Sequence, residues 1–143
     1  MNYNWQIISP EIAILLSAFI LILVDLFLKK GKHAVLLSVG FIGIMSAIIL
    51  TFRNFDVIGV GFSNGVMSDP IGFYFKIIFC LGTLLTLFIS ATYIKREIRA
   101  PGEYYVLIFI ATFGMMVMAT AADLISIFLG LEVMSIPLYV LAE

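Results

Sequence analysis

Five long apolar runs, separated by short polar connections, make up most of the chain. Each run holds about 20 mostly hydrophobic residues, enough for a helix to cross a hydrocarbon layer about 30 Å thick. The pattern predicts transmembrane helices over residues 10–28, 34–52, 71–94, 104–122 and 124–142. We therefore expect an all-α integral membrane protein, a polytopic five-helix bundle that forms one transmembrane domain over residues 1–143.

The first run has no feature of a removed signal peptide. No Lys or Arg precedes Glu11, and no small-residue cleavage site follows the apolar core. We expect this run to remain as the first membrane helix.

The composition agrees with a lipid environment. Hydrophobic residues make up 63% of the chain and charged residues 12%, against about 45–50% and about 25% in soluble domains. Mean hydropathy is +1.18, and so small a globule has too little interior to hide that much apolar surface from water. The net charge of -1 and the scattered cations exclude nucleic acid as a partner.

The reactive residue types are too few for a soluble active site. The single cysteine, Cys80, lies in an apolar run, and we interpret it as a small buried hydrophobic residue. His33 follows a cluster of lysines and is interpreted as an interfacial loop residue. Because no nucleophile with a base, phosphate loop or metal-ligand set can be assembled, a soluble enzyme or a receptor finds no support.

The longest connection, over residues 53–69, predicts a small β-hairpin. The turn-like residues 63–65 are flanked by the β-prone Val57, Ile58, Val60 and Val66, and the hairpin is expected at the outer face. Asp69 followed by Pro70 predicts an N-cap with proline in the first helical turn, where its missing N–H costs nothing.

Glu132 is the most conspicuous charge. It lies about eight residues into the fifth predicted helix, which places it roughly 12 Å below the helix start and close to the bilayer midplane. A charged residue at that depth costs roughly 2.5–3.5 kcal/mol on insertion, so it needs a partner or a water-lined cavity. We interpret Glu132 as a buried protonatable carrier. The alternative is a protonated acid that only bridges two helices.

Three neighbours of Glu132 support that interpretation. Gly130 permits close approach of another helix, and Ser135 lies one turn away. Pro137 leaves the Val133 carbonyl without its helical donor, so the helix should bend beyond Glu132. A role for Pro137 in helix packing alone is an equally good interpretation.

Three further charges have simpler explanations. Lys76 lies about 9 Å into the third helix, where we expect an ion pair with a carboxylate of a neighbouring helix, either structural or part of a charge relay. Asp25 and Lys29 are four residues apart, the spacing of an interfacial salt bridge. Asp123 lies at the turn between the fourth and fifth helices, where an N-cap role is favoured.

Three segments resemble the antiporter-like membrane subunits of respiratory NADH:quinone oxidoreductase, or complex I. They are SPEIAILLSAFILILVDLF (residues 9–27), DPIGFYFK (residues 69–76) and GEYYVLIFIATFGMMVMATAADLISIFLGLEVMSIPLYVL (residues 102–141). Residues 102–143 resemble the start of the first antiporter-like repeat. The segment DLISIFLGLEVMSIPLYVL, residues 123–141, carries most of the resemblance, which is greatest to subunit N.

The resemblance implies a translocase subunit in an energy-transducing membrane, such as the bacterial inner membrane. In that family a glutamate of the fifth helix passes protons, and Glu132 falls on it. Lys76 falls on a lysine of the third helix whose role is less certain. Other membrane subunits are the implied partners. No cofactor is expected in this chain, because flavin, iron–sulfur clusters, NADH and quinone would belong to other subunits.

Such subunits continue through two inverted five-helix repeats, and the lysines of their broken helices have no counterpart in these residues. A cation/proton antiporter or membrane-bound hydrogenase subunit shares the pattern around Glu132 and is one alternative. A purely structural helix bundle with paired charges is another.

The distribution of Lys and Arg predicts the orientation. Residues 29–33 and 95–103 each hold three cations, whereas the connections at the opposite end offer only Arg53. Since positively charged short loops stay cytoplasmic, the N-terminus is predicted outside and both cationic loops inside. Four aromatic residues are the expected interfacial anchors: Tyr3, Trp5, Tyr104 and Tyr105.

The orientation can be tested by protease protection in sealed membranes. Protease added to the outer face should leave the 95–103 loop intact, because the bilayer shields it. Cleavage of that loop from outside would overturn the orientation.

Overall fold

The computed structural model describes residues 5–28, 32–61, 63–97 and 101–142. Within them the elements are five helices and one two-stranded sheet. They are α1 (Ser9–Phe27), α2 (Lys32–Arg53), β1 (Gly59–Gly61), β2 (Val66–Ser68), α3 (Pro70–Glu97), α4 (Pro101–Thr120) and α5 (Leu124–Ala142). All five helices are long and apolar enough to cross a membrane. The fold class predicted from the sequence is confirmed.

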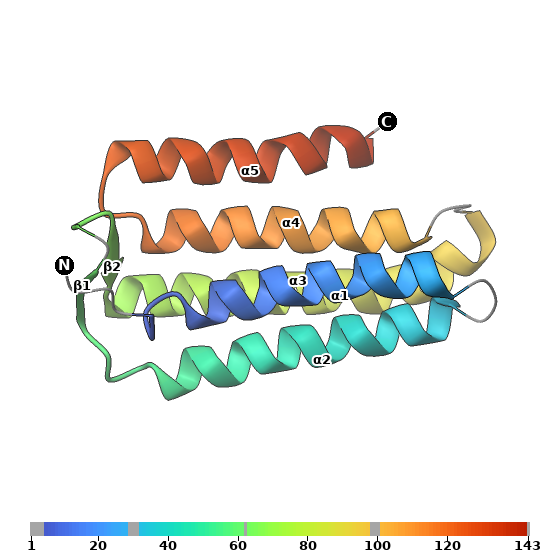
Figure 1. The fold of residues 1–143 in the computed structure, drawn as a ribbon, viewed down its shortest axis with the longest axis horizontal. Coiled ribbons are helices and arrows are strands. Elements are labelled where there is room, and N and C mark those ends of the chain that lie inside the picture. Colours follow the sequence, from blue (N-terminus) through green and yellow to red (C-terminus); the bar gives the residue numbers. More distant parts are fainter. Residues whose placement is uncertain (1–4, 29–31, 62, 98–100, 143) are drawn as a thin grey trace.

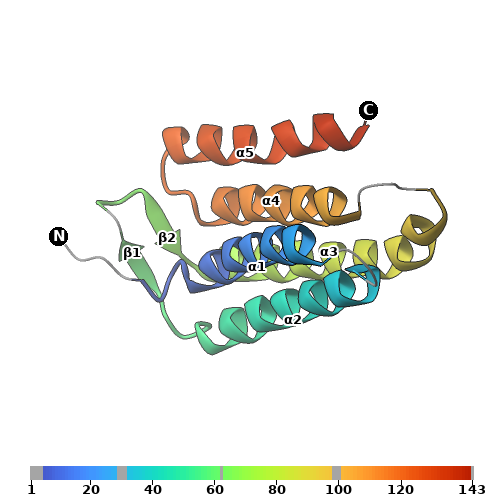
Figure 2. The same cartoon turned by 45° about the vertical axis from the view of Figure 1, so that its right-hand side comes forward.

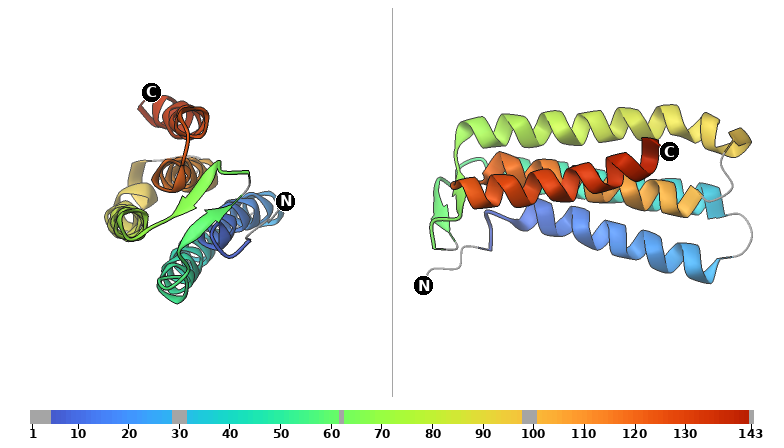
Figure 3. Two further views of the ribbon diagram at one scale, coloured as in Figure 1. Left: turned by 90° about the vertical axis from the view of Figure 1, so that its left-hand side faces the viewer. Right: turned by 90° about the horizontal axis from the view of Figure 1, so that it is seen from above.

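The helices lie side by side, with the β-hairpin at one end of the bundle (Figure 1). This end also holds the start of α1 and the turn between α4 and α5, and we call it the hairpin end. Helix α4 packs against every other helix. Seen along the helices, α4 lies between α5 and the rest, while α5 forms the edge (Figure 3, left). The bundle is therefore built around α4.

Among the described residues, the central buried apolar cluster is built from side chains of α1 to α4. Its largest fully buried members include Ile14 and Leu21 of α1, Ile44 of α2, and Phe109 of α4. Many large apolar side chains point outward instead, as expected where lipid replaces water as the solvent. Cys80 is buried in this core, as predicted.

The predicted hairpin is present and lies at the end of the helix bundle (Figure 2). β1 pairs antiparallel with β2, with Val60 opposite Met67. Ser63 and Asn64 adopt positive φ values of 56° and 68°, the left-handed conformation that tight turns require. The Ala122 N–H donates to the Gly65 carbonyl at 3.1 Å, so the hairpin is bonded to the α4–α5 turn.

The predicted start of the third helix is also confirmed. The Gly72 N–H donates to Asp69 Oδ1 at 2.8 Å, and Pro70 is the first residue of α3. The carboxylate thus caps the N–H groups that a helix start leaves unpaired.

Two smaller predictions are wrong. His33 lies inside α2 rather than in a loop, and its Nε2 is 3.3 Å from the hydroxyl of Tyr105. That contact joins α2 to α4. Tyr105 is fully buried rather than interfacial, because it packs into the core at the start of α4.

Two glycines let α4 and α5 approach backbone to backbone. A methyl group added at Gly114 would come within 2.5 Å of the Met134 nitrogen and 2.8 Å of the Gly130 carbonyl oxygen. One added at Gly130 would meet the Gly114 carbonyl oxygen at 3.0 Å. Small residues at such a crossing let the two backbones come into close van der Waals contact. In lipid this packing stabilises helix association, because the hydrophobic effect contributes little there.

Substitution of either glycine by alanine should weaken this crossing. Backbone atoms cannot rotate away, so Gly114→Ala and Gly130→Ala are each expected to lower the free energy of unfolding by about 1–3 kcal/mol, the usual cost of overpacking. Unfolding in mixed micelles, followed by circular dichroism, measures this.

Gly82→Ala is the matched control, because Gly82 lies inside α3 and a methyl group there has no neighbour within 4 Å. It should be neutral or slightly stabilising, since alanine favours a helix over glycine. Equal losses for all three variants would contradict the close crossing.

Candidate functional site

A buried ion pair joins α1 to α3 near the hairpin end. Lys76 Nζ lies 2.8 Å from Glu11 Oε1, and the two side chains are only 8% and 4% exposed. Glu11 occupies the first turn of α1, where the helix dipole favours a carboxylate. The ion pair expected for Lys76 is therefore present, and Glu11 is its partner.

Two neutral groups complete the surroundings of this pair. Lys76 Nζ donates to the Ile7 carbonyl at 3.1 Å, and the Thr120 hydroxyl lies 3.4 Å from Glu11 Oε1. Thr120 is the last residue of α4, so three helices meet at the pair. The second carboxylate oxygen, Glu11 Oε2, is buried and has no hydrogen-bond partner among the described residues.

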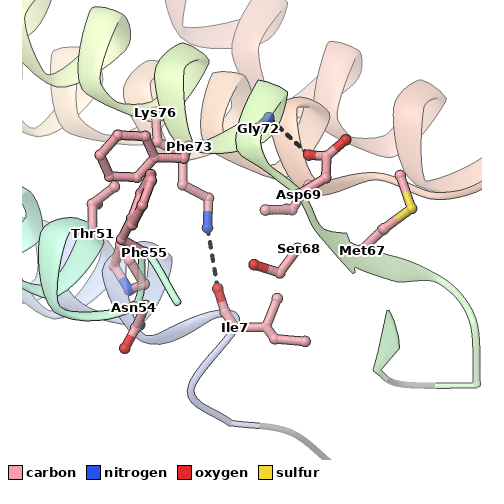
Figure 4. Close-up of a pocket in the computed structure, with 12 residues that line it drawn as sticks. Ile7, Thr51, Asn54, Phe55, Met67, Ser68, Asp69, Gly72, Phe73 and Lys76 are labelled. Carbon is pink, nitrogen blue, oxygen red and sulfur yellow. Dashed lines mark hydrogen bonds between the residues drawn. The ribbon is translucent and has the colours of Figure 1, made fainter. Parts of the chain in front are cut away.

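A small pocket of about 20 Å³ lies beside the pair, below the hairpin. Lys76 and Thr120 line it together with the polar Thr51, Asn54 and Asp69. Figure 4 shows the Lys76 side chain reaching the Ile7 carbonyl at this pocket. A site of this volume with several polar walls holds about one water molecule.

Glu132 lies apart from this cluster. The side chains that α5 buries against α4 include Gly130 and Pro137, and Glu132 is exposed on another side of the helix. At about 100° per residue, Glu132 points roughly 200° from Gly130, which is away from α4. Among the described residues, no hydrogen bond or ion pair engages its carboxylate.

The two supporting residues of α5 take other contacts. The Ser135 hydroxyl donates to the Leu131 carbonyl at 2.5 Å, the bond by which helical serines satisfy themselves in lipid. Pro137 is buried against the bundle inside a helix that continues to Ala142. Gly130 gives the close approach that was predicted for it.

Asp25 lies against the start of α4. A methyl group added at Gly102 would overlap the Asp25 side chain, so the carboxylate packs directly over this glycine. The predicted partner, Lys29, lies outside the described residues. The contact at Gly102 places the carboxylate beside the N-terminal turn of α4, where the helix dipole favours a negative charge.

Asp123 caps α5 as predicted. The Ser126 N–H donates to Asp123 Oδ1 at 2.7 Å. Hydrogen bonds from the Ser126 side chain and backbone hold the pKa of the exposed Asp123 carboxyl below its ordinary value. Asp123 thus has a structural role at the hairpin end.

Sequence reasoning missed Glu11 and Thr120 as members of the charged cluster. The signal for Glu11 was available, because an acid at the start of an apolar helix carries the same insertion cost as Lys76. Glu11 and Lys76 lie near the same end of their predicted helices, so the sequence already allowed them to be paired. Nothing in the sequence marks Thr120.

Comparison with known proteins gives a consistent result. The chain is 40% identical over 139 residues to NADH-quinone oxidoreductase subunit N of Trichlorobacter lovleyi, and the match covers 97% of this chain and 28% of that protein. It is 39% identical to subunit N of Brevibacillus brevis, covering 98% and 28% of the two chains. Subunit N 2 of Rhizobium meliloti is 36% identical, covering 96% and 29%. No family model matches the chain.

The chain therefore spans under a third of the length of the relatives it matches. The resemblance to subunit N that the sequence indicated is confirmed over nearly all of these residues.

The Asp123 cap makes a pH-dependent contribution to stability. Because its pKa is lowered in the folded chain, the carboxylate stabilises α5 above the unfolded pKa, and this stabilisation is lost as the pH falls through the folded pKa. Asp123→Ala should lower the unfolding midpoint at neutral pH and lose its disadvantage in acid. Asp123→Asn should keep most of the cap at both pH values. Thermal unfolding in detergent measures both, and a pH-independent difference between wild type and Asp123→Ala would contradict the charged cap.

Proposed function

We propose that this chain, which resembles part of NADH-quinone oxidoreductase subunit N over nearly all its residues, acts in a membrane subunit of that complex. The similarity carries the proposal, together with five helices suited to a membrane. Its partners are other membrane subunits and the lipid bilayer, and its work is to move protons while electrons pass from NADH to quinone. The redox chemistry, with flavin, iron–sulfur clusters and both substrates, belongs to other subunits.

Glu132 is the proposed proton carrier. It lies eight residues after Leu124, roughly 12 Å along α5 and near the middle of the helix. A carboxylate exposed at that depth requires a partner beyond the contacts of this bundle, because hydrocarbon does not solvate it. A carboxyl group facing a polar partner in this way can take up and release a proton as the partner moves.

The surrounding helix supports this role. Pro137 lies five residues beyond Glu132 and leaves the Val133 carbonyl without its helical donor. A carbonyl freed within a membrane helix can hold water or an ion near the acid. The proposed carrier thus has a place where a proton-conducting water can bind.

Replacing Glu132 by Gln in the full-length subunit tests the role. The amide keeps the shape but cannot carry a proton, so we expect NADH-driven proton pumping by the assembled complex to fall roughly tenfold or more. Pumping is measured by a pH-sensitive dye in membrane vesicles. Glu103→Gln is the matched control, because Glu103 is an exposed acid in the first turn of α4 and should leave pumping unchanged.

Other outcomes identify the alternatives. Weaker assembly with normal pumping per assembled complex would mean that the charge is structural. Sodium-dependent proton exchange without NADH would indicate a cation/proton antiporter or a hydrogenase-type subunit instead. Normal assembly and normal pumping would remove Glu132 from the proton path.

A further inference from the structure

We propose that Glu11 and Lys76 form a second proton-binding site, loaded through the pocket at the hairpin end. The inference rests on the proposed function, since it adds to the proton path a group that sequence reasoning did not include. Glu11 is its central residue, and Lys76, Thr120 and the Ile7 carbonyl position it.

The pair can redistribute its own proton without creating an isolated charge. In its ionic form Lys76 is an ammonium and Glu11 a carboxylate, 2.8 Å apart. Transfer of one proton breaks an N–H bond of Lys76 and forms an O–H bond on Glu11, leaving a neutral amine and a neutral acid. The amine then takes a proton from a hydronium ion in the pocket, which becomes a neutral water molecule. The site then holds one proton more than before, and the Lys76 ammonium, now beside a neutral acid, keeps the Ile7 carbonyl as its acceptor. Both charges are nearly excluded from water, so burial makes the neutral pair accessible.

The unpartnered oxygen of Glu11 favours the neutral form of the acid. Oε1 already accepts from Lys76 and lies near the Thr120 hydroxyl, whereas Oε2 is buried with no partner among the described residues. A buried acceptor left unpaired costs about 1–3 kcal/mol. Protonation of the carboxyl removes the negative charge that Oε2 shares, which lowers the cost of leaving that oxygen without a donor.

The pocket supplies a route from the hairpin end. Its volume of about 20 Å³ accommodates roughly one water molecule, and its walls include Lys76 and Thr120, the two side chains that bond Glu11. Asn54, Ser68 and Asp69 offer further polar groups at this pocket (Figure 4). Water held there can pass a proton to Lys76 while it receives another proton from the hairpin end.

Few other ionisable groups of the described residues face the pair. Asp69 lines the pocket from the start of α3, but its Oδ1 already accepts from the Gly72 N–H. Cys80 lies one turn beyond Lys76 on α3 and within electrostatic range of both members. The pocket-lining residues in α1, α2 and α4 are the neutral Pro10, Thr51 and Thr120, and those flanking α1 and α2 are the neutral Ile7, Asn54 and Phe55.

Lys76→Arg separates a proton site from a structural ion pair. Arginine keeps the positive charge and can bond a carboxylate, but it does not lose its proton in proteins. We expect the variant complex to assemble and its NADH-driven pumping to fall at least tenfold. Wild-type pumping by an assembled Lys76→Arg complex would overturn the proposal.

If Lys76→Arg fails to assemble, the double variant Glu11→Gln with Lys76→Met replaces it. Removing both charges leaves no unpaired ion, so a purely structural pair can be exchanged in this way with little loss of stability. Assembly with pumping reduced at least tenfold supports a proton site. Assembly with normal pumping overturns it.

Infrared titration gives a readout that needs no turnover and therefore distinguishes failure of this site from failure of the proposed function. Wild-type complex in lipid should show a protonated-carboxyl signal that grows as the pH falls, is absent in Glu11→Gln and persists in Glu103→Gln. Its absence from the wild type, or its survival in Glu11→Gln, would overturn the proposal.

Discussion

Hydrocarbon offers no hydrogen bonds, and the structure follows from that constraint. Each polar group of a spanning segment must find its partner inside the protein, which favours helices over any open strand. Hydroxyl groups obey the same rule: Ser17 and Thr51 each donate to the carbonyl four residues earlier, at 2.7 Å. The two strands occur only in the connection at the hairpin end, where backbone groups outside the helices can meet water.

The same constraint explains how the helices hold together. Lipid is as apolar as leucine, so burial of apolar side chains contributes little and close packing contributes more. Gly43 meets the Ser17 side chain where α2 crosses α1, and Gly114 meets Gly130 where α4 crosses α5. No described residue of α5 belongs to the buried apolar core of the bundle. The attachment of α5 therefore depends on that second crossing.

The spans could be predicted from sequence because hydropathy and length are local properties. The need of Lys76 for a carboxylate could also be predicted, since it follows from the cost of a buried charge. Glu11 carries the same signal, an acid in an apolar helix, but the contact itself depends on how the whole bundle packs and is seen only in the structure. The prediction for His33 failed for a related reason. Its neighbouring lysines indicate a loop, whereas in the structure His33 lies in α2 and contacts Tyr105 of α4, a residue distant in sequence. The sequence also does not mark Gly114 as a crossing point, because its close contact with α5 is known only once the two helices are packed together.

Glu11 and Glu132 differ in their contacts, and helix α4 packs between the helices that carry them. Thr120 of α4 is within bonding distance of Glu11, and Gly114, six residues earlier, abuts Gly130, two residues before Glu132. At the glycine crossing the backbones of α4 and α5 approach each other closely, and the Met118 side chain of α4 packs against Gly130. Helix α4 therefore contacts both the Glu11–Lys76 pair, through Thr120, and the helix that carries Glu132, through Gly114. The two acids themselves face different surroundings, since Glu11 is buried and Glu132 is exposed.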